Sequence, residues 1–277
     1  AYARKLTVLV YDKNGYRRDL QVEQTMTGLT TTVEVNKLVK GEKYSFLFWA
    51  QSADATCFTL DAANGKVAID YATAMNNEKV DAFFAQELDM EAKVNPTTKT
   101  VVLKRPFAQI NLGTNDMDAF AANAFAAATS TLTIKHIYNT LDLHDGSVAG
   151  VGAVTIPAAT IPAVGTKFKV GTTDEYNYLA LNYVLVEADK ALVEVEYAID
   201  NIAGIDAAKT VALQNIPVQR NYRTNLYGSL FTTSATFNVE ILPGFVDEFN
   251  NGTSTFNMEG VEKIGVNEYN ILNATGL

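Results

Sequence analysis

The chain has 277 residues, which is enough for two domains of ordinary size. Apolar residues make up 48% and charged residues 19%, so the chain can bury hydrophobic cores and does not have the composition of a disordered protein. The net charge of −9 argues against the basic surface that nucleic-acid binding requires. No run of about 18 apolar residues, as a membrane span would need, is present.

The first hundred residues are dominated by the alternation of apolar and polar residues that is typical of β-strands. Strands are predicted over 5–11, 30–36 and 40–51, the last of them apolar on both faces, as at the centre of a sandwich. A longer strand is predicted over 98–113. Pro106 lies inside it and cannot donate a ladder hydrogen bond, so it marks an edge, a bulge or a break.

Helical signals are few. The stretch 114–128 begins with a capping Asn115 and has apolar residues at helical spacing, which predicts one short helix crossing between strands. The stretch 76–88 fits either a helix or a loop. Residues 146–166, rich in Gly, Ala and Pro, are expected to form a long connection with a short edge strand.

The second half returns to period two. Strands are predicted over 130–138, 191–199, 210–231 and 235–242, in most cases with one apolar and one polar face. In the first of these, His136 shares the apolar face, so it is expected to be a core residue.

Strands, then one helix, then more strands, without βα alternation, indicate an all-β fold of two sandwiches or barrels. The sequence predicts an N-terminal sandwich over 1–105, a C-terminal sandwich over 106–245 and a C-terminal extension over 246–277. The extension has a strand pattern beyond an apparently complete domain. It could add edge strands to its own domain, or it could pair with another molecule by β-augmentation.

A polar row along 221–227 raises the question of an active site. It is interpreted instead as one face of the hairpin that closes the second sandwich, because no histidine or nucleophile accompanies it. Arg223 is expected to anchor a loop or a neighbouring subunit. The row consists of Asn221, Arg223, Asn225 and Tyr227, alternating with Tyr222, Thr224 and Leu226.

No enzyme is predicted, and no catalytic, cofactor-binding or metal-binding residue is expected. Motifs of hydrolases, nucleotide-binding proteins and zinc peptidases are missing from the sequence. His144, between Asp142 and Asp145, fits a turn better than a metal site. Cys57, the single cysteine, fits a small buried hydrophobe better than a nucleophile.

Five segments, in this order, resemble the fimbrillin superfamily of Bacteroidales, the FimA/Mfa-like subunits of type V pili. Their shared order and spacing over roughly residues 5–245 make the resemblance specific for the family. The segments are TVLVYDKNG, KGEKYSFLFWAQ, KVDAFF, VVLKRPFAQINLGT and NYRTNLYGSLFTTSATFNVEILPGF.

The resemblance implies two transthyretin-like Greek-key β-sandwiches in an exported lipoprotein. In that family a protease cuts after an arginine and removes the first strand, and a strand from the next subunit fills the groove. The implied protein is a stalk subunit of a cell-surface pilus attached to the outer membrane. Its partners would be identical subunits, head to tail, with anchor and tip pilins. The sequence enters a strand almost at once, as expected for a processed or a trimmed subunit.

In stalk subunits of the family the donor strand is the C-terminal tail, so the resemblance places it within 246–277. The alternative is a non-polymerising surface adhesin or carbohydrate-binding protein on the same fold. The candidate donor residues are the apolar residues of this tail: Phe256, Met258, Val261, Ile264, Val266, Tyr269, Ile271 and Leu272.

Overall fold

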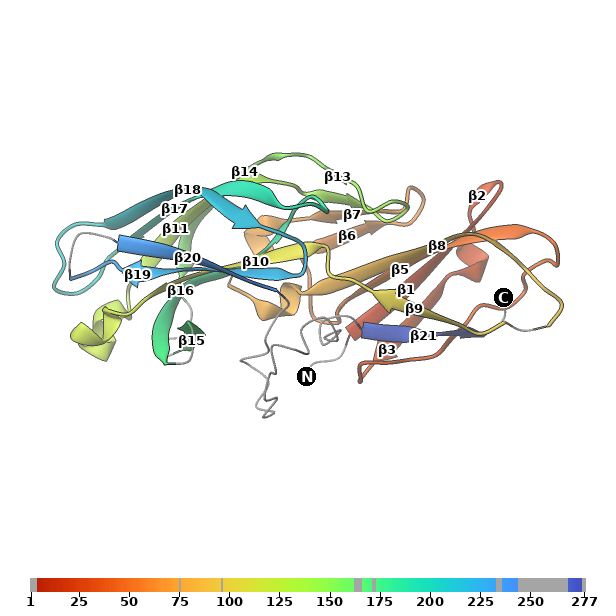
Figure 1. Cartoon of the computed structure of the whole chain (residues 1–277), viewed down its shortest axis with the longest axis horizontal. Coiled ribbons are helices and arrows are strands. Elements are labelled where there is room, and N and C mark those ends of the chain that lie inside the picture. The colour runs from red at the N-terminus through yellow and green to blue at the C-terminus, as the bar shows by residue number, and fades with distance from the viewer. Residues whose placement is uncertain are drawn as a thin grey trace.

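The computed structural model describes residues 4–74, 76–95, 97–161, 166–170, 173–232, 236–243 and 269–275. Within these ranges the chain is all-β, and the helical segments are single turns of 3-10 helix. Figure 1 shows an elongated molecule, with the sheets of the first hundred residues at one end and those of the later residues at the other.

The strands are β1 (Arg4–Asp12), β2 (Gly15–Tyr16), β3 (Val22–Met26), β4 (Val33–Glu34), β5 (Lys43–Ser52), β6 (Phe58–Asp61), β7 (Lys66–Ile69), β8 (Ala82–Glu91), β9 (Lys99–Leu103), β10 (Phe107–Thr114), β11 (Thr129–Ile137), β12 (Thr140–Asp142), β13 (Val148–Ala149), β14 (Gly152–Thr160), β15 (Lys167–Val170), β16 (Asp174–Leu185), β17 (Ala191–Asp200), β18 (Lys209–Val218), β19 (Tyr222–Ser229), β20 (Thr236–Pro243) and β21 (Tyr269–Thr275). The helical turns of the described ranges are η1 (Arg18–Leu20), η2 (Tyr71–Thr73), η3 (Glu78–Val80), η4 (Met117–Ala119) and η5 (Ala122–Phe125).

These strands form five sheets. The N-terminal sheet has the order β2-β1-β5-β8, with β3 also paired to β1, and faces a small sheet of order β4-β21-β9, which we call the groove sheet. The two C-terminal sheets have the orders β15-β16-β10-β19-β20 and β14-β11-β17-β18. A bridging sheet, β13-β12-β7-β6, takes strands from both sides of Pro106, so backbone hydrogen bonds join the two halves of the chain.

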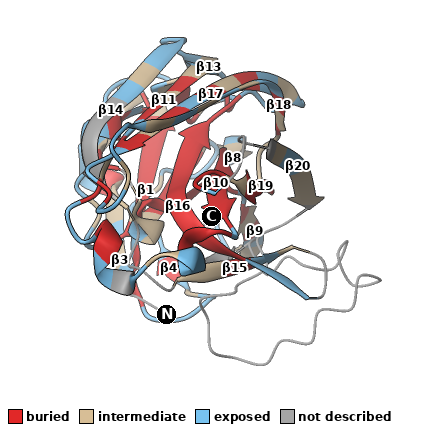
Figure 2. Cartoon of the chain, turned by 90° about the vertical axis from the view of Figure 1, so that its left-hand side faces the viewer, coloured by how far each residue is buried: buried red, intermediate tan, exposed pale blue. Residues whose placement is uncertain are grey.

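Two hydrophobic cores follow from these layers. The smaller lies between the N-terminal sheet and the groove sheet, and includes Leu6, Phe46 and Leu103. The larger runs from the opposite face of the N-terminal sheet, through Trp49, into the space between the C-terminal sheets. Figure 2 shows the buried residues concentrated in the central strands β1, β10 and β16.

The two halves also meet in a buried ionic cluster. Arg105 lies in the link between β9 and β10, and its Nη2 donates to Asp81 Oδ2 at 2.7 Å, while its Nε donates to the other carboxylate oxygen. Its Nη1 donates to Asn221 Oδ1 at 2.7 Å, just before β19. Arg4 Nη2 approaches the same Asp81 at 3.8 Å, and both guanidinium groups lie over the Phe83 ring. One carboxylate therefore faces two buried guanidinium groups from distant parts of the chain.

The predicted helix over 114–128 is wrong. β10 continues to Thr114, and the chain then makes two separate 3-10 turns, η4 and η5, divided by an extended Phe120 with φ −112° and ψ 156°. The helix would have to displace Asp116, whose carboxylate accepts backbone N–H groups of Leu230, Phe231 and Thr232 at 2.8–3.1 Å. These tertiary contacts override a weak local helical preference.

His136 is exposed, so its predicted place in the core is wrong. Its φ is +65°, and the pairing of β11 with β14 shifts register between Lys135 and Ile137. This β-bulge resets the alternation, so Ile137 is buried and the imidazole lies outside, 3.8 Å from Glu194.

Three other segments also differ from expectation. The stretch 76–88 forms η3 and then β8, a strand rather than a helix. The Gly-rich connection contains β14, which is an edge strand as predicted but nine residues long. β16 was not predicted, because it is buried on both faces over most of its length and shows no alternation.

Substitution of Asp81 tests the ionic cluster. Asp81→Asn removes the carboxylate that both buried guanidinium groups approach, and is expected to cost about 3–5 kcal/mol in the free energy of unfolding. Urea denaturation measures this cost. The control is Glu196→Gln, which removes an exposed partner of Lys135 and is expected to cost below about 1 kcal/mol. Equal costs for the two variants would contradict the role of the cluster.

Asp116 is expected to make stability depend on pH. Burial raises the pKa of this carboxyl, but hydrogen bonds from Thr114 and the backbone N–H groups of 230–232 outweigh it and hold the pKa below its ordinary value. The carboxylate therefore stabilises the fold above its unfolded pKa of about 3.9, and this contribution is lost as the pH falls through the lowered folded value.

The Asp116 prediction is measured by urea unfolding from pH 7 down to pH 3. Asp116→Asn is expected to cost about 1–3 kcal/mol at pH 7, because a hydrogen-bonded charge is removed. The difference between wild type and variant should shrink in acid. A difference that stays constant over this range would show that the carboxylate charge is not the cause.

Candidate functional site

The groove sheet is the most unusual part of the fold, because its middle strand comes from the far end of the chain. β21 runs antiparallel to β9, with Tyr269 opposite Leu103 and Ile271 opposite Val101. It runs parallel to β4, where Ala274 pairs with Val33. Figure 1 shows β21, in dark blue, beside β9 in the N-terminal half of the molecule.

β4 and β9 depend on β21 for their inner hydrogen bonds. Strands that flank a third strand lie about 9–10 Å apart, twice the spacing of neighbours, so they cannot pair directly. Without β21, each would present an unpaired edge to a gap one strand wide. The site is therefore a strand-docking groove with one edge on each side.

The floor of the groove is apolar. Val33 on β4, together with Val101 and Leu103 on β9, is at most 5% exposed and belongs to the smaller core. Phe46 and Phe48 on β5 and Phe83 on β8 belong to the same cluster from the facing sheet. Removal of the middle strand would expose part of this cluster to water, at about 1.5–3 kcal/mol for each large side chain.

Three of the candidate donor residues fall on this strand. The structure places Tyr269, Ile271 and Leu272 on β21, with the first two at register positions opposite buried residues of β9. The other candidate residues, Phe256, Met258, Val261, Ile264 and Val266, lie outside the described residues. The assignment of all eight as a donor to another subunit stays a prediction.

Sequence reasoning did not identify the residues that form the groove. Val101 and Leu103 alternate on β9, which ends just before Pro106, and Val33 lies on the two-residue β4 with Val35 just after it. The available signal was this alternation of apolar residues within the strands predicted over 30–36 and 98–113. The partner itself could not be found from local pattern, because it lies more than 160 residues further along the chain.

The polar row of 221–227 is largely buried, so it is not the exposed face of a hairpin. Arg223 Nε donates to Gln109 Oε1 at 2.8 Å, on the parallel neighbour β10. Two residues further along both strands, Asn111 donates to Asn225 at 3.0 Å, and Asn225 donates to Glu240 on β20 at 3.2 Å. These side chains tie three strands together, which is a structural role.

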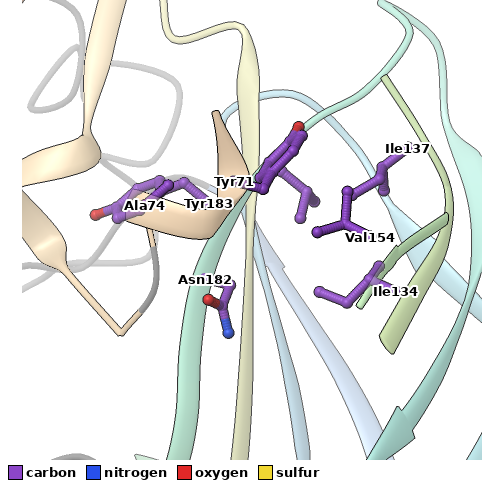
Figure 3. A pocket seen from close by; sticks show the side chains of 8 residues that line it. Tyr71, Ala74, Ile134, Ile137, Val154, Asn182 and Tyr183 are labelled. Carbon is purple, nitrogen blue, oxygen red and sulfur yellow. The ribbon is translucent and has the colours of Figure 1, made fainter. Parts of the chain in front are cut away.

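The remaining candidates offer little chemistry. A cavity of about 10 Å³ has room for about one water molecule. Tyr71, Ile134, Asn182 and neighbouring side chains line it (Figure 3). Burial raises the pKa of the Cys57 thiol to about 11, which agrees with its predicted structural role. His144 lies in a turn, as predicted, with its Nδ1 3.0 Å from Asp142.

Two further features of the described ranges bear on function. No three His, Cys, Asp or Glu side chains of those ranges gather closely enough to hold a metal ion. None of the helical segments there is long and apolar enough to cross a membrane.

Hydrogen exchange tests whether β21 completes the sheet. The amides of β9 are expected to be protected in the full chain, and to exchange several orders of magnitude faster in a variant that ends at Pro243, because one edge loses its acceptors and donors. Mass spectrometry of the fragment covering 99–103 measures this. Fragments from β16, in a sheet that does not contain β21, serve as the internal control. Unchanged protection of β9 in the shortened chain would contradict the pairing.

Comparison with known proteins gives one family match. Residues 1–259 match the model of a family described as a family of unknown function, DUF6562. No curated protein matches the chain.

Several solved structures are similar to the chain. One is a protein from Bacteroides uniformis, provisionally described as a cell adhesion protein, with 11% identity, a TM-score of 0.48, and coverage of 87% of this chain and 91% of that one. A second is the tip fimbrial protein Mfa3 from Porphyromonas gingivalis, with 11% identity, a TM-score of 0.41, and coverage of 87% and 93%. A third is a fimbrial assembly protein from Parabacteroides distasonis, with 13% identity, a TM-score of 0.41, and coverage of 87% and 92%.

These proteins are of the kind that the sequence resemblance leads one to expect. At such identities and TM-scores, however, the likeness carries no argument about the function of this chain. The family match covers most of the sequence and stands on its own. The chain belongs to the family of unknown function DUF6562.

Proposed function

We propose that the chain is a structural subunit of a cell-surface type V pilus, which polymerises head to tail by donor-strand exchange. In this proposal the C-terminal tail of one subunit fills the groove between β4 and β9 of the next. The finer assignments belong to the same proposal: two transthyretin-like Greek-key sandwiches divided near residue 105, a stalk position with anchor and tip pilins as further partners, attachment to the outer membrane, and support of adhesion.

The observation that carries the proposal is the position of β21 in the middle of the groove sheet. The N-terminal sandwich needs a strand that its own neighbouring sequence does not supply, and the tail supplies one with a defined register. A strand docked in this way contributes main-chain hydrogen bonds, while alternate side chains can fill the apolar floor. The same strand could serve a second copy, because the groove recognises the segment and not its connection.

The length of the connection permits exchange between copies. Residues 244–268 separate β20 from β21 in the sequence. Fully extended, a chain of this length reaches at most about 80–90 Å. A contact in which the tail of one copy enters the groove of another is head-to-tail, and it propagates into a filament when the rotation between successive copies does not close a ring.

Electron microscopy tests the proposal. The full chain, kept for days at high concentration, is expected to form filaments, and a variant that ends at Pro243 is expected to form none. Ile271→Asp in the full chain should also prevent filaments, because it places a charge at the register position opposite buried Val101. The matched control is Asn267→Asp, which adds the same charge just before the strand and should leave filaments intact.

A synthetic peptide of residues 262–277 shows whether the shortened chain fails to form filaments because it lacks the strand or because it is misfolded. The peptide is expected to raise the Tm of the variant ending at Pro243, and a scrambled peptide is not. Filaments formed by the shortened chain would overturn the proposal. A full chain that binds glycans as a monomer and never assembles would favour a non-polymerising adhesin instead.

A further inference from the structure

We infer that β21 is a self-capping strand, which closes the groove of its own subunit and holds it in a form that cannot accept a neighbour. For its consequence in assembly, this inference rests on the proposed function. The closed form itself rests on the pairing of β21 with β4 and β9 of the same chain.

Both edges of the groove are occupied in the closed form. β21 pairs with β9 at Tyr269, Asn270, Ile271 and Ala274, and with β4 at Ala274 and Thr275. A strand from another subunit would need the same donors and acceptors. Its entry therefore requires that β21 leave first, which makes self-capping and strand exchange mutually exclusive in any one groove.

Tethering favours the closed form. A strand joined to its groove by a connection of this length has an effective concentration on the order of millimolar. Free subunits at micromolar concentration compete at a disadvantage on the order of a thousandfold, because exchange forms only the strand pairing that the subunit already has within itself. The isolated protein is therefore expected to be mainly a monomer.

The closed form is nevertheless built so that it can open. β4 is only two residues long, and it pairs with β21 only at the end of that strand. The ladder to β9 shifts register between Ile271 and Ala274, which interrupts its hydrogen bonds. A short and interrupted ladder opens at a lower free-energy cost than the global unfolding of the sheets. Opening of the cap, and not collision of subunits, is then the slow step of assembly.

A designed disulfide tests the inference. In a Cys57→Ala background, Val102→Cys and Asn270→Cys place two thiols at directly paired positions. Val102 is only partly buried, so this site spares the core. On oxidation of dilute protein, we expect a bond within one chain, seen as a loss of two hydrogens by mass and a mobility shift without a dimer band. This locked protein should form no filaments until a reductant is added.

The matched control replaces Val102→Cys by Thr100→Cys, which lies two residues out of register with Asn270. The two Cα atoms are then beyond the distance of about 7 Å that a disulfide tolerates, so little bond should form. Efficient oxidation of the control would show that the tail is not held in this register, and would overturn the inference.

The remaining outcomes separate the inference from the proposed function. Disulfide bonds between chains in dilute protein, seen as dimers and larger species together with filaments, would overturn self-capping and leave strand exchange standing. An efficient bond within one chain, followed by no filaments after reduction, would support self-capping and overturn the proposed polymer. Absence of any bond, within or between chains, would overturn self-capping, because the paired thiols are adjacent in the closed form.

Discussion

A strand inside a β-sheet must be hydrogen-bonded along both edges, and in the part of the chain that the structure describes, the N-terminal half completes its small sheet with β21. β4 and β9 flank a gap that no neighbouring segment fills. With β21 in place, the gap becomes the middle of the small sheet whose flanking strands contribute to the smaller hydrophobic core. The connectivity of the chain, its proposed assembly and its self-capping all follow from this one missing partner.

Several contacts join the rest of the molecule to the half that contains the groove. The bridging sheet joins the two halves by backbone hydrogen bonds, and the cluster of Asp81 with Arg4 and Arg105 joins them by ion pairs. The side-chain hydrogen bond from Asn111 on β10 to Asn225 on β19 favours one register of this parallel pair. Parallel strands are not joined by a short turn, so no turn sets their register. Buried polar groups are costly unless they are satisfied, so these contacts favour one arrangement of strands over its slipped alternatives.

Period-two alternation predicts the half-buried strands well, because such a strand must alternate whatever lies opposite it. The all-β class follows from the same local signal, and the break at Pro106 follows from the missing backbone N–H of proline. Prediction is wrong where a tertiary contact decides. A bulge turns His136 outward, and the backbone N–H groups that donate to Asp116 divide the expected helix into two turns. β16 is buried on both faces, so its sequence shows no alternation of apolar and polar residues. The partner of β9 was the hardest to find, because the tail pattern allowed pairing within the chain or with another molecule, and nothing local distinguishes them.

The direction of β21 also has a mechanical consequence. The strand lies between two neighbours with its axis along theirs, so a pull transmitted along the strand loads the flanking hydrogen bonds together, in shear. A pull at right angles would break them one after another, as a zip opens, at much lower force. A groove that releases its strand readily when one end frays can therefore resist tension along the strand axis, and a fibre subunit needs both properties at different times.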